Sequence, residues 1–130
     1  MIIDASSILA IVLEEDEGPS FTDRILDCEE PMTISPVNVW EIAARINKLG
    51  DPAPLGRTER LLDHYGIDIA VIDRTQLEHA IDAQARFGKG NHGARLNMGD
   101  CFAYALAKSR GEPLLYKGDD FPRTDIEPVA

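Results

Sequence analysis

The stretch from Leu96 to Phe121, LNMGDCFAYALAKSRGEPLLYKGDDF, decides how this chain folds. An apolar, helix-like segment begins at Asp100, and a short apolar run from Leu114 to Tyr116 follows it. A helix followed closely by a short strand is typical of one crossover unit in an α/β protein. Asp119 and Asp120 come directly after that run, so carboxylates stand at both junctions of the unit.

The same alternation of strand and helix continues toward the N-terminus. The spacing of apolar residues predicts strands at 1–3, 33–35, 68–72 and 114–116, with an edge strand at 126–129 weakened by a proline. Helices are expected at 5–13, 19–28, 37–49, 58–65 and 74–87, with a proline-containing turn at 51–54. The glycine-rich stretch 88–93, GKGNHG, is a loop. We therefore predict one α/β domain over residues 1–130, with a mainly parallel central sheet flanked by helices.

The composition excludes several classes of protein. The chain has 130 residues, of which 44% are hydrophobic, and this is enough to bury one core. The two cysteines, Cys28 and Cys101, lack the paired spacing of a zinc site, and no apolar run is long enough to span a membrane. The formal net charge of −10 argues against a protein that holds nucleic acid mainly by long-range attraction. We expect a reduced, cytoplasmic protein that binds any polyanion locally.

Acidic residues follow the predicted strands. Asp4 comes directly after the first strand, Glu41 lies in the helix after the second, and Asp100 begins the last helix. Asp119 and Asp120 follow the last strand. The loops after parallel strands open at one edge of a sheet, so these carboxylates are predicted to meet there. Clustered carboxylates repel one another and are normally held by a divalent cation with oxygen ligands, here Mg²⁺ or Mn²⁺.

Each acid also has a simpler explanation. Asp4 and Asp100 stand where polar side chains cap helices, the latter three residues after Asn97. Glu41 has the environment of an ordinary charge on a helix surface, and Asp119 with its neighbour fits a plain turn. The joint placement favours a site, because four independent causes would otherwise have to bring every acid to the same edge.

Three blocks of this sequence resemble the PIN-domain ribonuclease toxins of the VapC type. They are MIIDASSILAIVL from residue 1, VWEIAARI from residue 39 and GKGNHGARLNMGDCFAYALAKSRGEPLLYKGDDFPRTDI from residue 88. The third block is the specific one, and the resemblance spans nearly the whole chain. It implies a PIN-like fold and a Mg²⁺-dependent endoribonuclease, the toxin of a type II toxin–antitoxin pair. It further implies a cognate antitoxin protein as partner and a homodimer as the assembly.

The resemblance also implies roles for the acids. Asp4, Glu41 and Asp100 match its metal-binding acids, and it favours Asp120 as the fourth, with Asp119 still a candidate. We expect Asp4 and Asp100 to be direct metal ligands, and Glu41 and Asp120 to bind through water or to orient the attacking water. A metal-activated water would then hydrolyse RNA phosphodiester bonds, so that no serine or cysteine nucleophile is needed.

A basic stretch precedes Asp100. Residues 83–99 contain no acid and include Lys89, His92 and Arg95. We expect these three side chains to contact RNA phosphates beside the metal. The alternative is a solvated loop without a binding role.

Other polar and aromatic residues leave alternatives open. Ser6 either binds a phosphate or a metal water, or caps the first helix. Trp40 is expected to pack in the core or against a partner instead of stacking on a base. His64, His79 and His92 are rival acid–base groups, but the places of His64 and His79 in predicted helices favour surface or packing roles for these two.

Two other functions compete with the nuclease. A phosphoacceptor signalling domain would use Lys117 after the last strand, yet it would also need paired acids where Asp4 stands alone. A non-catalytic interaction domain would use its acids only to bind a partner. The apolar residues Leu9, Val12 and Phe21 fit either a core or a partner surface.

Overall fold

A four-stranded parallel sheet forms the centre of the molecule. The computed structural model describes residues 1–90 and 93–130. Its strands are β1 (Ile2–Ile3), β2 (Met32–Ile34), β3 (Ile67–Ile69) and β4 (Leu114–Leu115). They lie in the order β3-β2-β1-β4, and every neighbouring pair is parallel. The α/β fold with a mainly parallel sheet, predicted from the sequence, is confirmed.

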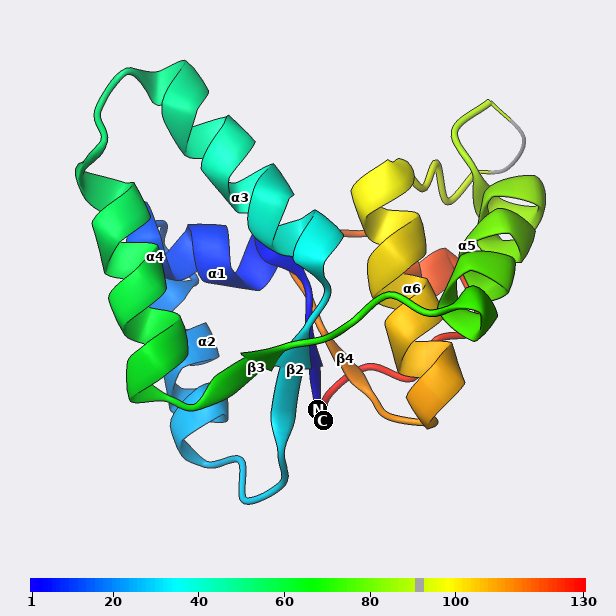
Figure 1. The fold of residues 1–130 in the computed structure, drawn as a ribbon, viewed down its shortest axis with the longest axis horizontal. Coiled ribbons are helices and arrows are strands. Elements are labelled where there is room, and N and C mark those ends of the chain that lie inside the picture. The colour runs from blue at the N-terminus through cyan, green and yellow to red at the C-terminus, as the bar shows by residue number, and fades with distance from the viewer. Residues whose placement is uncertain (91–92) are drawn as a thin grey trace.

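Helices cover both faces of this sheet (Figure 1). In the described residues they are α1 (Ala5–Val12), α2 (Gly18–Leu26), α3 (Pro36–Leu49), α4 (Ala53–His64), α5 (Arg74–Phe87) and α6 (Met98–Arg110), with the short 3₁₀ helix η1 (Phe121–Arg123). The first four pack on one face, and α5 and α6 pack on the other. Within these described ranges, none of the helices has the length and apolar character needed to cross a membrane.

Strands β1, β2 and β4 are short but buried, and β1 and β4 each contribute to two cores. Ile2 and Leu114 point into the core beneath α5 and α6, whereas Ile3 and Leu115 point into the core beneath α1 to α4. This alternation follows from the two-residue period of a strand, and a parallel sheet needs both faces covered. The sheet thereby holds the carboxyl ends of β1 and β4 side by side.

Two elements, α4 and β3, differ most from their predicted bounds. Helix α4 begins at Ala53, five residues before the predicted start, and Pro54 lies in its first turn. Proline is tolerated there because the first N–H groups of a helix have no partner within the helix, so the predicted turn at 51–54 was too long. Strand β3 ends at Ile69, short of the predicted 68–72.

The C-terminal segment lies beside β4 without forming a regular strand. The Leu114 amide donates to the Glu127 carbonyl at 2.9 Å, and the Val129 amide donates to the Leu114 carbonyl at 3.1 Å. Between them Pro128 makes one isolated parallel bridge to Leu114. Proline has no N–H to donate, so the predicted strand at 126–129 is reduced to a single bridge in the part of the chain described.

Candidate active site

Asp4 stands at the carboxyl end of the central strand β1. Its carboxylate is the N-cap of α1, and its Oδ2 accepts from the Ser6 amide at 3.0 Å and from Ser6 Oγ at 2.5 Å. The side chain is only 2% exposed. Burial raises the pKa of Asp4, and the hydrogen bonds from Ser6 act in the opposite direction. The capping role predicted for Asp4 is correct, and it leaves a buried carboxylate at the sheet edge.

Ser6 joins Asp4 to the end of β4. The backbone amide of Lys117 donates to Ser6 Oγ at 2.9 Å, so one hydroxyl links the segments that follow β1 and β4. The other oxygen of Asp4, Oδ1, is buried and has no hydrogen-bond partner among the described residues. An unpartnered buried carboxylate oxygen is costly, and it is a natural ligand for a cation.

Asp100 has the capping role considered from the sequence. Its amide donates to Asn97 Oδ1 at 2.8 Å, and the Asn97 amide donates to Asp100 Oδ2 at 3.0 Å, which is a capping box at the start of α6. Burial and the negative charge of Asp4 raise the pKa of Asp100 to about 7. The capping box therefore holds an acid whose charge is opposed by another acid.

Glu41 reaches the same place from α3. Burial raises the pKa of Glu41 to about 7, and the charges of Asp4 and Asp100 add to this effect. The glutamate lies directly against Gly99, where a Cβ atom would come within 1.5 Å of Glu41 Oε2. Only a residue without a side chain leaves room for this carboxylate beside the first turn of α6.

A hydrogen bond from Asn38 joins α3, which carries Glu41, to α6, which carries Asp100. Asn38 Nδ2 donates to the Gly99 carbonyl at 3.0 Å in a buried contact, and the first turns of α3 and α6 face each other in Figure 1. Sequence reasoning missed both Asn38 and Gly99. Two signals in the sequence could have indicated them: Gly99 directly precedes the candidate acid Asp100, and Asn38 lies one helical turn before the candidate acid Glu41.

Two acids, Asp119 and Asp120, lie in the turn after β4. The charge of Asp120 is among the causes that raise the pKa of Asp100, whereas that of Asp119 is not. Both side chains are exposed. The electrostatic contact thus supports the choice of Asp120 over Asp119.

The assembled acids fit a divalent cation by their chemistry. Oxygen donors from three separate segments face one another, and no lysine or arginine is among the charges that shift the pKa of Asp4, Glu41 or Asp100. Within residues 1–90 and 93–130, no three His, Cys, Asp or Glu side chains already stand close enough to hold an ion together. Direct ligation by several acids therefore requires their side chains to rotate inward.

The predicted RNA contacts lie partly within the structure. Lys89 and Arg95 are exposed, and the Lys89 amide donates to the Leu96 carbonyl at 3.0 Å, which closes the loop just before Asn97. Arg95 has a positive φ of 57°. His92, the third predicted contact, lies outside the described residues.

The structure excludes a core position for Trp40, which was one of the two packing roles expected for it. Its side chain is 66% exposed, although it directly precedes Glu41 on α3. Val12 and Phe21, by contrast, are buried in the core beneath α1 to α4. His64 and His79 lie in α4 and α5, as their predicted helices required.

Lys117 is held away from the role that a phosphoacceptor domain would give it. Its Nζ forms ion pairs with Glu15 and with Glu17, the latter at 3.1 Å. These contacts direct the ammonium group toward the end of α1 and not toward Asp4. The structure thus gives the phosphoacceptor alternative no support.

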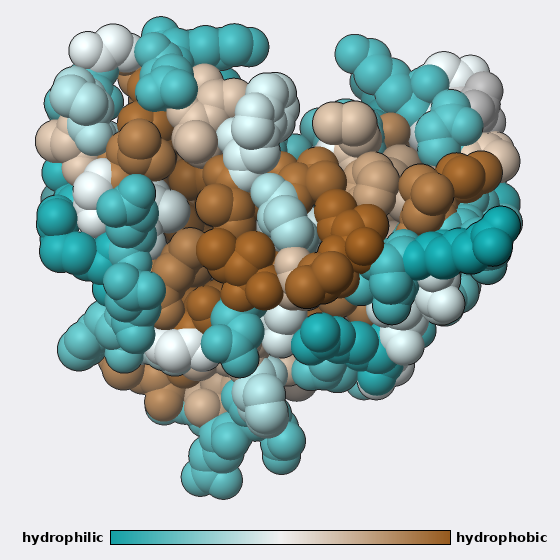
Figure 2. All heavy atoms as spheres, in the orientation of Figure 1, coloured by the Kyte–Doolittle hydropathy of each residue, from teal (hydrophilic) through white to brown (hydrophobic). Residues whose placement is uncertain are grey.

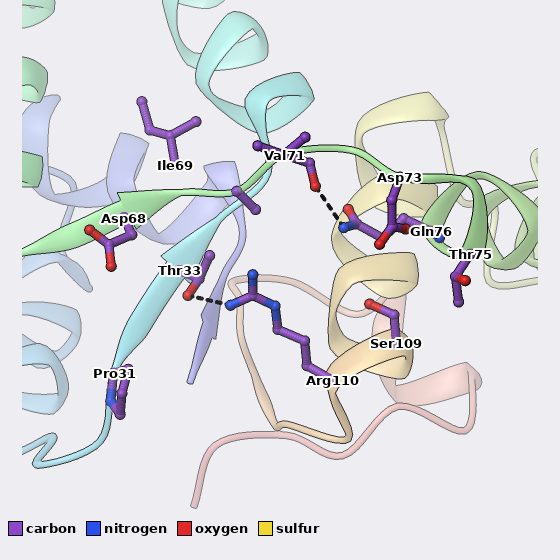
Figure 3. Close-up of a pocket in the computed structure, with 11 residues that line it drawn as sticks. Pro31, Thr33, Asp68, Ile69, Val71, Asp73, Thr75, Gln76, Ser109 and Arg110 are labelled. Atoms are coloured by element: carbon purple, nitrogen blue, oxygen red, sulfur yellow. Dashed lines mark hydrogen bonds between the residues drawn. The ribbon is translucent and has the colours of Figure 1, made fainter.

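A separate pocket of about 730 Å³ lies at the edge of the sheet near β3 (Figure 3). In it Arg110 donates to Thr33 Oγ1 at 3.0 Å, and Gln76 Nε2 donates to the Val71 carbonyl at 2.8 Å. None of the site acids is among its described lining residues. These contacts tie α6 to β2 and the start of α5 to the end of β3, which is a structural role.

Comparison with known proteins shows the family of this chain. The family model of the PIN domain matches residues 1–127, and the chain belongs to the PIN-domain family. Ribonuclease VapC42 of Mycobacterium tuberculosis is 41% identical over 131 residues, covering 100% of this chain and 99% of that protein. Ribonuclease VapC30 of the same organism is 37% identical over 132 residues, covering 100% and 98%. Within the PIN family the chain is thus a VapC-type ribonuclease toxin, a hydrolase.

A solved structure shows the same fold at low sequence identity. The crystal structure of VapC20 from Mycobacterium tuberculosis, titled a sarcin-ricin loop cleaving toxin, superposes with a TM-score of 0.80 at 13% identity. The match covers 98% of this chain and 97% of that one. The arrangement of strands and helices is therefore shared where most side chains differ.

Proposed function

We propose that this ribonuclease is a Mg²⁺-dependent endoribonuclease, with Mn²⁺ as a substitute, acting as a single domain over residues 1–130 in the cytoplasm. One observation carries the proposal: Asp4, Glu41 and Asp100 arrive from three separate segments, and the charge of Asp4 raises the pKa of both Glu41 and Asp100. Asp4 and Asp100 are the direct ligands in this proposal. Such a set of mutually repelling carboxylates is stabilised by a divalent cation.

The remaining residues serve the hydrolysis of the phosphodiester bond. When bound, the cation supplies positive charge to the phosphate and lowers the pKa of water. Glu41, whose pKa is about 7 in the metal-free protein, accepts a proton from the attacking water at its carboxylate. Asp120 orients the same water from the turn after β4. Ser6 keeps the Asp4 carboxylate in place through its two hydrogen bonds.

Lys89, His92 and Arg95 bind the RNA backbone in this proposal. The first and last of these are exposed cations in the loop that leads directly into α6. Their charge offsets locally the repulsion between RNA and a chain of net charge −10.

The toxin role implies a cognate antitoxin and a second copy of this chain as partners. An arginine of the antitoxin is suited to the carboxylate cluster, because its planar fork pairs with carboxylates in two hydrogen bonds. For the homodimer we propose an apolar surface in the middle of the face shown in Figure 2, where β3 leads into α5. Its exposed members are Ile69, Val71, Leu77, Ile81 and Met98. A patch of this kind on a small protein commonly marks an interface.

The test compares the wild-type protein, free of antitoxin, with Asp100→Asn on total cellular RNA. Asparagine keeps an oxygen for the Asn97 amide while it removes the charge, so the capping box survives. We expect cleavage by the wild type with Mg²⁺ or Mn²⁺, and no cleavage with EDTA or by the variant. Equal cleavage with and without EDTA, or by both proteins, would refute the metal site.

A further inference from the structure

A groove begins beside the acids and runs along one face of α3. It has a volume of about 700 Å³. One wall comes from α1 and the turn after it, with Leu9, Leu13 and Glu15, and the other comes from α3. Its end at the active site is formed by Glu41, Asn97, Lys117 and Gly118. A molecule that reaches the acids from this side must pass along α3.

Trp40 is the aromatic side chain of this groove. It is 66% exposed, and it is the single tryptophan of the chain. Core packing does not account for an indole left this open. Its place directly before Glu41 puts a flat apolar surface next to a proposed proton acceptor.

Two cations continue the same helix face. Arg45 and Lys48 line the groove and follow Glu41 by four and seven residues, which is a rise of about 6 Å and 10 Å along the helix. Both are exposed, and neither forms an ion pair with any described residue. In a chain of net charge −10, a groove edge with two unpaired cations is suited to an anionic ligand.

We propose that this groove holds the single-stranded RNA next to the cleaved bond, with one base stacked on Trp40 and the following phosphates on Arg45 and Lys48. An exposed aromatic ring followed by spaced cations is the combination that binds unpaired nucleotides. The proposal extends the metal-dependent ribonuclease site, on which it rests. Trp40 is a substrate-positioning residue here, since it acts on a neighbouring base and not on the cleaved phosphate.

The first test uses Trp40 as its own probe. Because it is the only tryptophan, its fluorescence reports the groove directly. The Asp100→Asn protein is titrated with a mixed-sequence single-stranded RNA oligonucleotide carrying a fluorophore for anisotropy. We expect saturable quenching of the indole emission with the same midpoint as the anisotropy change. Binding by anisotropy with unchanged tryptophan emission would overturn the proposal.

The second test measures cleavage kinetics. Trp40→Ala should raise the KM for a single-stranded RNA about tenfold, and Trp40→Phe should restore most of it because the ring is kept. Leu26→Ala is the control, since it removes a side chain of similar exposure (61%) from α2, outside the groove lining. Equal KM values for Trp40→Ala and wild type would overturn the proposal and leave the groove to a protein partner.

The third test concerns the cations. Arg45→Glu and Lys48→Glu should each lower the slope of log KM against log salt by about 1, because one phosphate contact is lost. Arg24→Glu, an exposed cation on α2, changes the net charge equally and should leave the slope unchanged. If the wild type cuts RNA but these slopes do not move, only the groove is refuted. If the wild type cuts no RNA with either metal, the proposed function fails first.

Discussion

Charges are arranged in opposite ways in two regions of this molecule. At the amino end of β1 the terminal ammonium lies 2.7 Å from Glu112, and on α6 Lys108 lies 2.8 Å from Asp125. Burial acts to raise the pKa of Asp125, but the hydrogen bonds from Lys108 and Tyr104 outweigh it, and the pKa falls below its ordinary value. At the carboxyl ends of β1 and β4, Asp4 and its neighbours have raised pKa values and no cation among the causes.

The difference separates acids that stabilise the fold from acids that cost it stability. A paired carboxylate favours the native state, whereas a buried acid facing other acids disfavours it unless it is neutralised. A buried acid that faces other acids is therefore found only where surrounding contacts fix its position. Here the capping box at Asp100, the Ser6 bonds to Asp4 and the packing on Gly99 supply those contacts.

The same substitution in the two regions should give opposite results. Asp4→Asn should lower kcat by about a hundredfold or more, because an oxygen ligand of the proposed ion is lost, and should raise the melting temperature by removing a buried charge. Asp125→Asn should leave kcat unchanged and lower stability by about 1 kcal/mol, because its pair with Lys108 is weakened. Cleavage assays and thermal unfolding check both proteins. If Asp125→Asn lost activity and Asp4→Asn kept it, the roles assigned to the two acids would be wrong.

A methyl group at Gly99 should disrupt the acid cluster without touching an acid. In Gly99→Ala the new Cβ would displace the Glu41 carboxylate, so we expect kcat to fall by about 10- to 100-fold while the protein stays folded. Gly56→Ala is the matched control in α4, because there the nearest atom is the flexible end of Arg60 at 3.2 Å. That control should keep full activity and gain up to about 1 kcal/mol of stability. Full activity of Gly99→Ala would show that Glu41 is not needed where it lies.

The stability of the metal-free protein should depend on pH through the cluster. The pKa values of Glu41 and Asp100 are raised to about 7 from 4.5 and 3.8, so the folded state binds protons that the unfolded state has released. The free energy of unfolding in EDTA should therefore fall as pH rises from about 4 to 7, by roughly 2 kcal/mol after allowance for solvent exposure.

Denaturant titrations at pH 5 and 8 measure this fall. Asp100→Asn should reduce it, and Mg²⁺ should restore stability at pH 8 by binding the ionised acids. A metal-free protein that is more stable at pH 8 than at pH 5 would contradict the raised pKa values.

The smallest expected effect concerns the loop before α6. Lys89→Glu and Arg95→Glu should each raise the KM for RNA several-fold with little change in kcat, because in the proposed function both side chains bind the RNA backbone and take no part in the cleavage of the bond. Arg60→Glu, an exposed cation on α4, has the same change in charge and should leave KM unaltered. Steady-state kinetics at low salt measure this difference in KM. Equal KM values for all three variants would show that the loop before α6 has no role in RNA binding.

Most elements were predictable because their apolar spacing is local. Helix α5 has the predicted bounds 74–87, and the strand order along the chain followed from short apolar runs. The early start of α4 was missed because prolines usually mark turns, while the first turn of a helix accepts them. The sequence left Trp40 open between the core and a partner surface, because an amphipathic pattern does not say which apolar residues a neighbouring element covers.

The sequence alone determined the α/β class, the acids that follow each strand and the family resemblance, because these depend on local periodicity and on residue identity. Only the tertiary structure decided that Glu41 lies against Gly99, that Asn38 joins α3 to α6 and that Ser6 links Asp4 to the end of β4. These contacts join residues up to 111 positions apart. Their distances depend on how whole helices pack on the sheet, and so do the raised pKa values of the acids, because burial and the mutual repulsion of charges exist only once the chain is folded.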